Sequence, residues 1–222
     1  MIVPFLPGEQ FLLQGVSGTL WEGVAGRALV AVQGSYLHLG RLNWSLSPLS
    51  LLSLGPRVDL DSHWGAQRIQ GELVYRSAES LELSDIDAVL PAVLVRQFVP
   101  LELSGSFALL LPRLVIDGGL PVEGAGQIVW QNAGWVSPRG KRALGTYAFD
   151  FEQTRGSALS GEVVTLSGDL QASGSVSLDG RNYAVDIVLS GPGLDDPQLQ
   201  QALQLVAIPE GDQFRVQMQG SF

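Results

Sequence analysis

Only a few side chains in this sequence of 222 residues could bind a metal ion or transfer protons. His38 and His63 have no second histidine or cysteine at ligand spacing, whereas a zinc site needs three or four ligands. The aspartates at 59–61 and 85–87 lack the glycine and glutamate of a calcium loop. We therefore expect no metal site, and we interpret the histidines as strand-surface residues and the aspartates as strand ends or helix caps.

The sequence shows no pattern of a catalytic or cofactor site. Gly124-Ala125-Gly126 could suggest a phosphate loop, but the Lys-Ser/Thr of a P-loop and the third glycine of a dinucleotide fingerprint are missing. It also leads into the strand-like segment 128–130 rather than a helix. The nucleophile-elbow pattern Gly-x-Ser-x-Gly does not occur, and the absence of cysteine excludes thiol catalysis and disulfides. We expect a protein that is not an enzyme and has no cofactor.

Tryptophan is the most conspicuous residue type with a possible binding role. The five tryptophans are Trp21, Trp44, Trp64, Trp130 and Trp135. We favour core filling for Trp44 and Trp130, which lie in regular strand patterns. The alternative is that tryptophans form the wall of an apolar groove or anchor an interface, where this residue is enriched.

Composition excludes several classes of partner. The formal net charge is −9 and no basic stripe is present, which argues against nucleic acid and against electrostatic docking on an anionic lipid surface. No run of 18 or more apolar residues occurs, so the sequence as given contains no membrane-spanning helix.

Alternation of apolar and polar residues predicts antiparallel strands with one buried and one solvated face. Asp179-Gly180 lies between two such segments and predicts a hairpin turn. Pro48 should end the first of these strands near Ser47, and the leucines after it should form a short helical turn or a buried loop. The alternating segments are Leu42–Leu46, Leu101–Leu109, Tyr147–Phe151, Val164–Leu170, Tyr183–Leu189 and Phe214–Met218.

Two segments have helical spacing. The first is Ser84–Phe98, in which Pro91 should cause a kink. The second is Pro197–Val206, with Asp196 as its N-cap and proline at its first position.

No linker or low-complexity segment divides the chain, so we expect one domain spanning residues 1–222. The predicted fold is all-β with two short helices. It is a strongly curved antiparallel meander of roughly ten strands, arranged as an open half-barrel or sandwich-like sheet. A sheet with one apolar face must curl, pack against helices or hold a ligand, because an uncovered apolar face would aggregate.

Three patterns, in this order along nearly the whole chain, resemble the type II secretion system protein N family of Gram-negative bacteria. The first is a glycine-led turn with tryptophan, the second a strand that ends in proline, and the third a central glycine-rich strand. Their residues are Gly18, Thr19, Leu20, Trp21 and Gly23; Leu42, Trp44 and Pro48; and Gly124, Gly126 and Trp130.

The resemblance implies a non-enzymatic accessory component of the type II secretion system. Members of this family have one N-terminal membrane helix in the inner membrane, followed by a periplasmic domain. Because this sequence lacks the helix, we expect residues 1–222 to be the periplasmic domain with the helix removed. The expected partners are other inner-membrane or periplasmic secretion subunits, reached through sheet edges.

The family is also thought to be similar in fold to AsmA- and TamB-type envelope proteins, some of which hold lipid. This similarity implies an alternative function, the binding of a phospholipid or acyl chain in an apolar groove. The candidate lining residues are Leu101, Leu103, Phe107, Tyr147, Phe149, Phe151, Val185 and Ile187.

Overall fold

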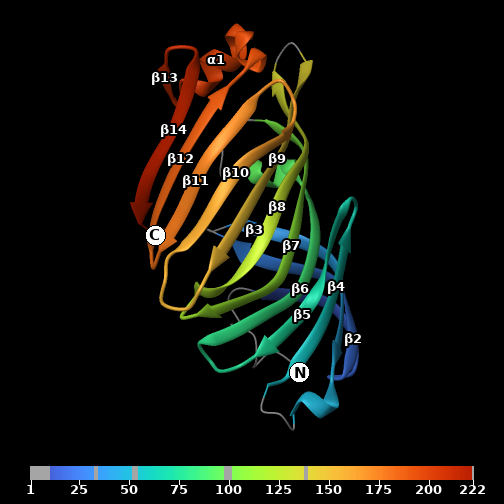
Figure 1. The fold of residues 1–222 in the computed structure, drawn as a ribbon. Helices are drawn as coiled ribbons and strands as arrows, with labels where there is room; N and C mark the ends of the chain where they lie inside the picture. The colour runs from blue at the N-terminus through green and yellow to red at the C-terminus, as the bar shows by residue number, and fades with distance from the viewer. Residues whose placement is uncertain (1–10, 33–34, 52–54, 98–101, 138–139, 222) are drawn as a thin grey trace.

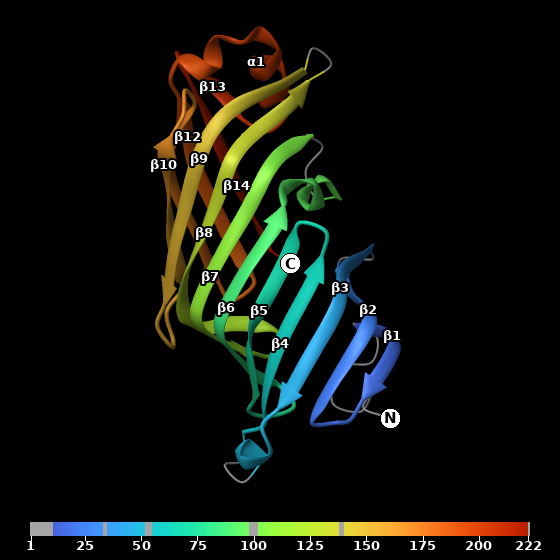
Figure 2. The same cartoon turned by 90° about the vertical axis from the view of Figure 1, so that its right-hand side faces the viewer.

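The computed structural model describes residues 11–32, 35–51, 55–97, 102–137 and 140–221. In these ranges fourteen strands form one antiparallel sheet (Figures 1 and 2). The strands are β1 (Phe11–Gly18), β2 (Glu22–Val32), β3 (Ser35–Leu46), β4 (Arg57–Trp64), β5 (Gln67–Tyr75), β6 (Ser80–Pro91), β7 (Leu103–Asp117), β8 (Leu120–Ser137), β9 (Gly140–Gln153), β10 (Leu159–Ser167), β11 (Gln171–Asp179), β12 (Asn182–Ser190), β13 (Ile208–Glu210) and β14 (Gln213–Ser221). The helical segments are η1 (Pro48–Leu51), η2 (Ala92–Gln97), η3 (Pro192–Asp195) and α1 (Pro197–Leu203).

The sheet is a meander, as predicted. Each strand from β1 to β12 pairs with the next, then β14 pairs with β12 and β13 forms the far edge. The predicted hairpin is confirmed, with Asp179 opposite Asn182 and Gly180 at φ 58°. The expected strand number was too low, because glycines such as Gly15 in β1 and Gly71 in β5 interrupt the alternation that identifies a strand.

The predicted helix at Ser84–Phe98 is wrong. Residues 84–91 belong to β6, and only the short segment η2 follows; residue 98 lies outside the described residues. Strand β6 contains a β-bulge, in which Asp85 and Ile86 together lie opposite Gly71, with Asp85 at φ 50°. The extra residue shifts the alternation by one position. The apolar residues of the predicted helix, among them Ile86, Val89 and Leu90, all follow the bulge. Ile86 and Leu90 lie on the apolar face and Val89 on the opposite face, so apolar residues on both faces of β6 imitate helical spacing.

The strand end before Pro48 and the start of the second helix are confirmed, but α1 ends at Leu203 rather than Val206, and the predicted strand at Val164–Leu170 ends at Ser167. Strand β3 ends at Leu46, and η1 begins at Pro48. Helix α1 begins at Pro197, where the Asp196 carboxylate accepts hydrogen bonds from the backbone N–H groups of Gln198 and Leu199. This cap satisfies donors that the first helical turn leaves free.

The two faces of the sheet differ in polarity. Directly paired residues of antiparallel strands point to the same face. Apolar pairs such as Trp44–Leu60, Leu83–Leu114 and Ile128–Phe149 lie on one face, which we call the apolar face. Pairs such as Asn43–Asp61 and Gln127–Asp150 lie on the opposite, polar face.

The largest buried cluster lies at the C-terminal end of the sheet, where η3 and α1 cover part of the apolar face (Figure 1). Its members come from β8, β9, β11, β14, η3, α1 and the loop before β11. They include Ala133, Trp135, Leu144, Tyr147, Leu170, Ala172, Leu194, Leu199, Leu203 and Phe214. Over the strands nearer the N-terminus most apolar side chains are half-buried, because neither α1 nor η2 extends across them (Figure 2).

Candidate functional site

An aromatic row crosses the middle of the apolar face. The rings of Phe107 and Trp130 stack with centroids 5.5 Å apart, and Tyr147 follows at 5.8 Å from Trp130. Their polar atoms are satisfied internally: Trp130 Nε1 donates to the carbonyl of Ser104 at 3.0 Å, and the Tyr147 hydroxyl donates to the carbonyl of Leu170 at 2.9 Å. Burial raises the pKa of Tyr147 to about 12. These residues hold strands together and offer no acid or base near neutral pH.

Gly126 of the central pattern and Gly161 of β10 make room for neighbouring aromatic rings. A Cβ at Gly126 would lie 2.8 Å from Phe151 Cζ, and one at Gly161 would lie 2.5 Å from Phe149 Cζ. Phe149 and Phe151 therefore lie flat against the sheet, with their ring centroids 5.7 Å apart. The family pattern at 124–130 thus lies in a strand, β8, as the sequence indicated.

The residues proposed to line a groove are distributed as follows. Leu101 lies outside the described residues, and Leu103 pairs with Trp135 near one end of β7. Tyr147 belongs to the buried C-terminal cluster, and Ile187 packs against it. The register places the remaining candidates, Phe107, Phe149, Phe151 and Val185, on the apolar face as half-buried side chains.

The N-terminal family pattern forms a close contact between β2 and β3. Gly23 is the direct partner of Trp44, and a Cβ at Gly23 would lie 2.5 Å from Cε2 and 2.6 Å from Cη2 of the indole. The ring therefore lies across the glycine. Its Nε1 is buried and has no hydrogen-bond partner.

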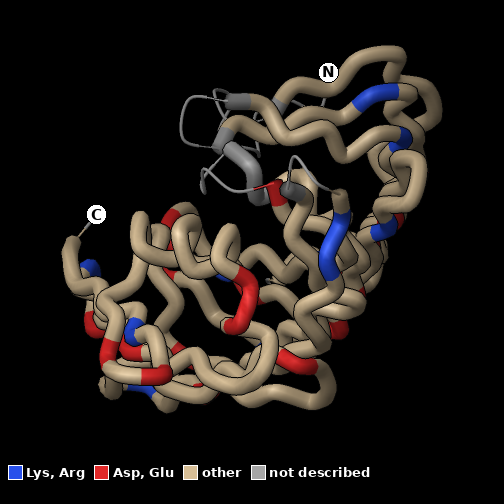
Figure 3. Tube along the Cα trace, turned by 90° about the horizontal axis from the view of Figure 1, so that it is seen from above, with Lys and Arg blue, Asp and Glu red and all other residues tan. Residues whose placement is uncertain are grey.

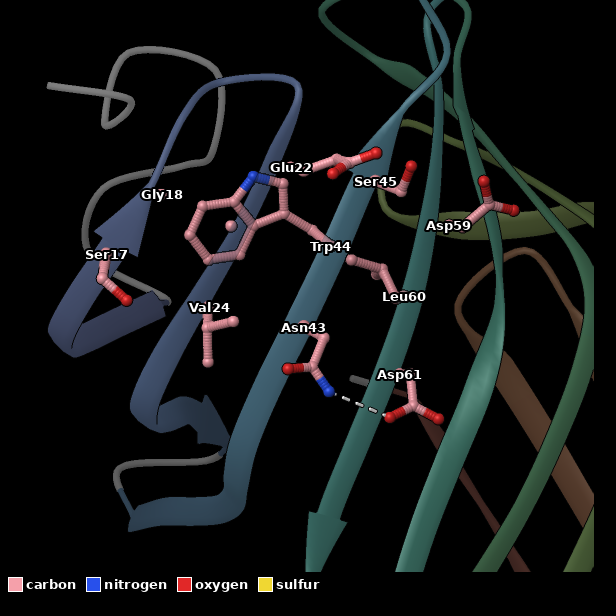
Figure 4. A pocket seen from close by; sticks show the side chains of 11 residues that line it. Ser17, Gly18, Glu22, Val24, Asn43, Trp44, Ser45, Asp59, Leu60 and Asp61 are labelled. Carbon is pink, nitrogen blue, oxygen red and sulfur yellow. Dashed lines mark hydrogen bonds between the residues drawn. The ribbon is translucent and has the colours of Figure 1, made fainter.

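Beside this contact is a hollow of about 430 Å³ (Figure 4). Its lining includes two rows of side chains, and within each row the residues are direct partners on neighbouring strands. The first row, on β1 to β4, is Ser17, Val24, Asn43 and Asp61. The second row, on β2 to β4, is Glu22, Ser45 and Asp59. Gly18, Gly23, Trp44 and Leu60 complete the lining. Asn43 Nδ2 donates to Asp61 Oδ1 at 3.1 Å across this hollow.

A chain of ion pairs runs from the turn after β5, across β6, β7 and β8, to the turn after β9. Arg76 and Arg113 both bind Glu82, with N–O distances of 3.0 Å, and Glu123 binds Arg113 at 2.6 Å and Arg155 at 3.3 Å. Hydrogen bonds from Arg113 hold the pKa of Glu82 and that of Glu123 below their usual values. Sequence reasoning missed this network, because the five residues meet only through the strand register.

The described part of the chain contains no group of His, Asp and Glu side chains that could hold a metal ion. His38 stacks on Trp64 with ring centroids 5.9 Å apart, and His63 Nδ1 lies 3.0 Å from Asp61 Oδ1. No helix in the described ranges is long and apolar enough to cross a bilayer. Along the described residues Lys and Arg are spread over many strands, with Lys141 and Arg142 adjacent at the start of β9 (Figure 3).

Comparison with known proteins identifies the family. Residues 9–217 match the family model described as type II secretion system (T2SS), protein N. The type II secretion system protein N of Aeromonas hydrophila is 29% identical over 225 residues, covering 97% of this chain and 86% of the relative. The protein of the same name from Vibrio cholerae serotype O1 is 31% identical over 151 residues, covering 64% and 58%. No solved structure matches the chain. Because the match spans nearly all described strands in order, this chain belongs to the type II secretion system protein N family.

Proposed function

We propose that this component of the type II secretion system is a non-enzymatic accessory subunit. It works as a single periplasmic domain held at the Gram-negative inner membrane, and it contacts other secretion subunits there. Family membership supports the role in secretion. The polar atoms of Trp130 and Tyr147 donate to backbone carbonyls, and the charged groups of the ion-pair chain bind one another, which supports a binding role rather than a catalytic one.

The observation that carries this proposal is the open sheet. Its two edges, β1 and β13, do not pair with each other. Strand β1 contains neither a charged residue nor proline, and among the described residues it pairs only with β2. Natural edge strands are usually protected by charge, proline or a covering segment, so an unprotected edge favours addition of a strand from a partner.

The test is affinity capture from cells that express the tagged full-length protein together with the other secretion subunits. We expect specific subunits to be recovered from the membrane fraction, in amounts that exceed those recovered with an unrelated periplasmic protein. Recovery of no secretion subunit would contradict the proposal. Fractionation and protease access in spheroplasts test the proposed location separately.

The apolar face supports a second candidate function, the binding of a phospholipid or acyl chain. Half-buried apolar side chains continue along β3 to β8, beyond the part that α1 covers. Native mass spectrometry of the protein purified with its membrane tests this function. A stoichiometric lipid that is lost in the variant Phe149→Asp but retained in Glu162→Lys would support it, whereas bare folded protein would count against it.

A further inference from the structure

Two turns at one end of the N-terminal strands present large apolar side chains to solvent. In the β1–β2 turn, the Thr19 hydroxyl accepts hydrogen bonds from the backbone N–H groups of Trp21 at 3.2 Å and Glu22 at 3.1 Å. The backbone N–H of Thr19 also donates to the Glu22 carbonyl at 2.7 Å. The turn is thus fixed by its own threonine, while Leu20 and Trp21 remain 44% and 41% exposed.

The second turn, η1, reverses the usual distribution of polar and apolar residues. Ser50 is buried: its hydroxyl donates to the Ser47 carbonyl at 2.6 Å and accepts from the Arg57 N–H at 2.9 Å. Leu49 and Leu51, on either side of it, are 76% and 41% exposed. The serine holds the turn against β4, so the leucines are displayed outward and contribute little to the core.

The two turns are joined. The backbone N–H of Leu46, just before η1, donates to the Trp21 carbonyl at 2.6 Å. In Figure 2, η1 projects beyond the lower ends of β3 and β4. We call the four exposed residues Leu20, Trp21, Leu49 and Leu51 the apolar tip. A fixed, protruding group of this kind is typical of a binding surface rather than of scattered exposed leucines.

Carboxylates line the hollow on the strands next to the two turns. Glu22 follows Trp21 in sequence and, with Asp59 and Asp61, lines the hollow shown in Figure 4. Among the described residues, neither Glu22 nor Asp59 has an ion-pair partner, whereas Asp61 is engaged by Asn43 and His63. The apolar tip therefore has an acidic rim on the side of the hollow, and Arg57, at the start of β4, is paired with Glu72.

We propose that the apolar tip is the docking surface for a partner protein that offers an apolar cleft rimmed by lysine or arginine. An apolar centre with a polar rim is the usual anatomy of a protein interface, and tryptophan is a common anchor in such centres. An anionic bilayer is a poor occupant, because the acidic rim and the net charge of −9 oppose it. The inference rests on the proposed function, since the partner is a subunit of the secretion system.

The experiment repeats the capture from cells that co-express the other secretion subunits, with quantitative mass spectrometry of each subunit. The test variants are Trp21→Ser with Leu49→Ser, and Glu22→Lys alone. We call the double variant Trp21→Ser, Leu49→Ser the tip variant. We expect it to recover at least about tenfold less of one subunit than the unmodified protein does, as for loss of an interface anchor. We expect Glu22→Lys to reduce recovery of the same subunit, and more strongly at low salt than at high salt.

Matched controls use equally exposed residues far from the tip. Leu205→Ser with Leu166→Ser removes side chains that are 73% and 59% exposed, one after α1 and one on β10, and Glu162→Lys reverses an exposed charge on β10. Both control variants should recover the same subunit in an amount within about twofold of that recovered with the unmodified protein. A photo-crosslinker at position 49 in the otherwise unmodified chain should label the same subunit, whereas one at position 205 should not. The crosslinking result does not depend on whether the serine variants fold.

The possible failures are distinguishable. If the unmodified protein recovers no secretion subunit, the proposed function fails. If the tip variant recovers as much of every secretion subunit as the unmodified protein does, only the docking inference fails. Two further results would overturn it: flotation with phosphatidylethanolamine–phosphatidylglycerol vesicles that depends on Trp21, and position 49 crosslinking two copies of this chain.

Discussion

The contact between Gly23 and Trp44 makes a sharp prediction for Gly23→Ala. A Cβ at this position would lie 2.5 Å from Cε2 and 2.6 Å from Cη2 of the indole, about 1 Å inside the ordinary contact distance of about 3.5–4.0 Å. The ring must move away or the strands must separate. Overpacking of this kind costs about 1–3 kcal/mol.

Replacing glycine by alanine also reduces the entropy of the unfolded chain, which offsets about 0.4–1 kcal/mol. We therefore expect a net destabilisation of about 1–2 kcal/mol. For a protein of this size, each kcal/mol corresponds to a fall in Tm of about 2–4 °C. Urea unfolding followed by tryptophan fluorescence and by circular dichroism measures the free energy of unfolding directly.

Gly26 supplies a matched control in the same strand. A Cβ there would find its nearest atoms, the carbonyl oxygens of Gln14 and Gly15, at 3.8 Å. Gly26→Ala should therefore be neutral or slightly stabilising. Combining Gly23→Ala with Trp44→Leu should remove most of the penalty relative to Trp44→Leu alone, because the overlapping ring is gone. Equal stability of Gly23→Ala and the unmodified protein, or an unchanged penalty in the double variant, would refute this reasoning.

Three further predictions concern ion pairs and caps. Glu82→Gln should cost about 1–2 kcal/mol in urea unfolding, because it breaks the charged hydrogen bonds from Arg76 and Arg113 to a carboxylate that is only 11% exposed; an unchanged midpoint would contradict this. Because the pKa of Glu82 is lowered in the folded state, its contribution is present above the unfolded pKa and is lost as pH falls through the folded pKa. The free energy of unfolding should therefore decrease below about pH 4.5, and less steeply in Glu82→Gln than in the unmodified protein. Asp196→Ala should cost about 1 kcal/mol through loss of the α1 cap, and Asp196→Ser should restore most of it; an equal loss in both would show that the pair with Arg142 matters more than the cap.

Part of the fold was predictable because its signals are local. Alternation over 147–151 and 183–189 depends on the two-residue period of a strand, and the structure places both segments in strands, β9 and β12. The cap at Asp196 and the stop at Pro48 follow from the hydrogen-bonding capacity of single residues. The error at β6 has the opposite origin: the strand carries apolar residues on both faces, Ile86 and Leu90 on one and Val89 on the other, and only its pairing with β5 and β7 identifies it as a strand.

The sequence by itself determined the all-β class, the family and the two-faced character of the strands, because these depend on residue type and spacing along the chain. Tertiary structure alone decided which residues meet. Strand register brought Glu82 to Arg113, 31 positions away, and laid Trp44 over Gly23. The apolar tip also depends on folding, because only the hydrogen bonds of Thr19 and Ser50 turn Trp21 and Leu49 toward solvent. Apolar residues in a sequence predict burial, and it takes the assembled sheet to show which of them remain available for a partner.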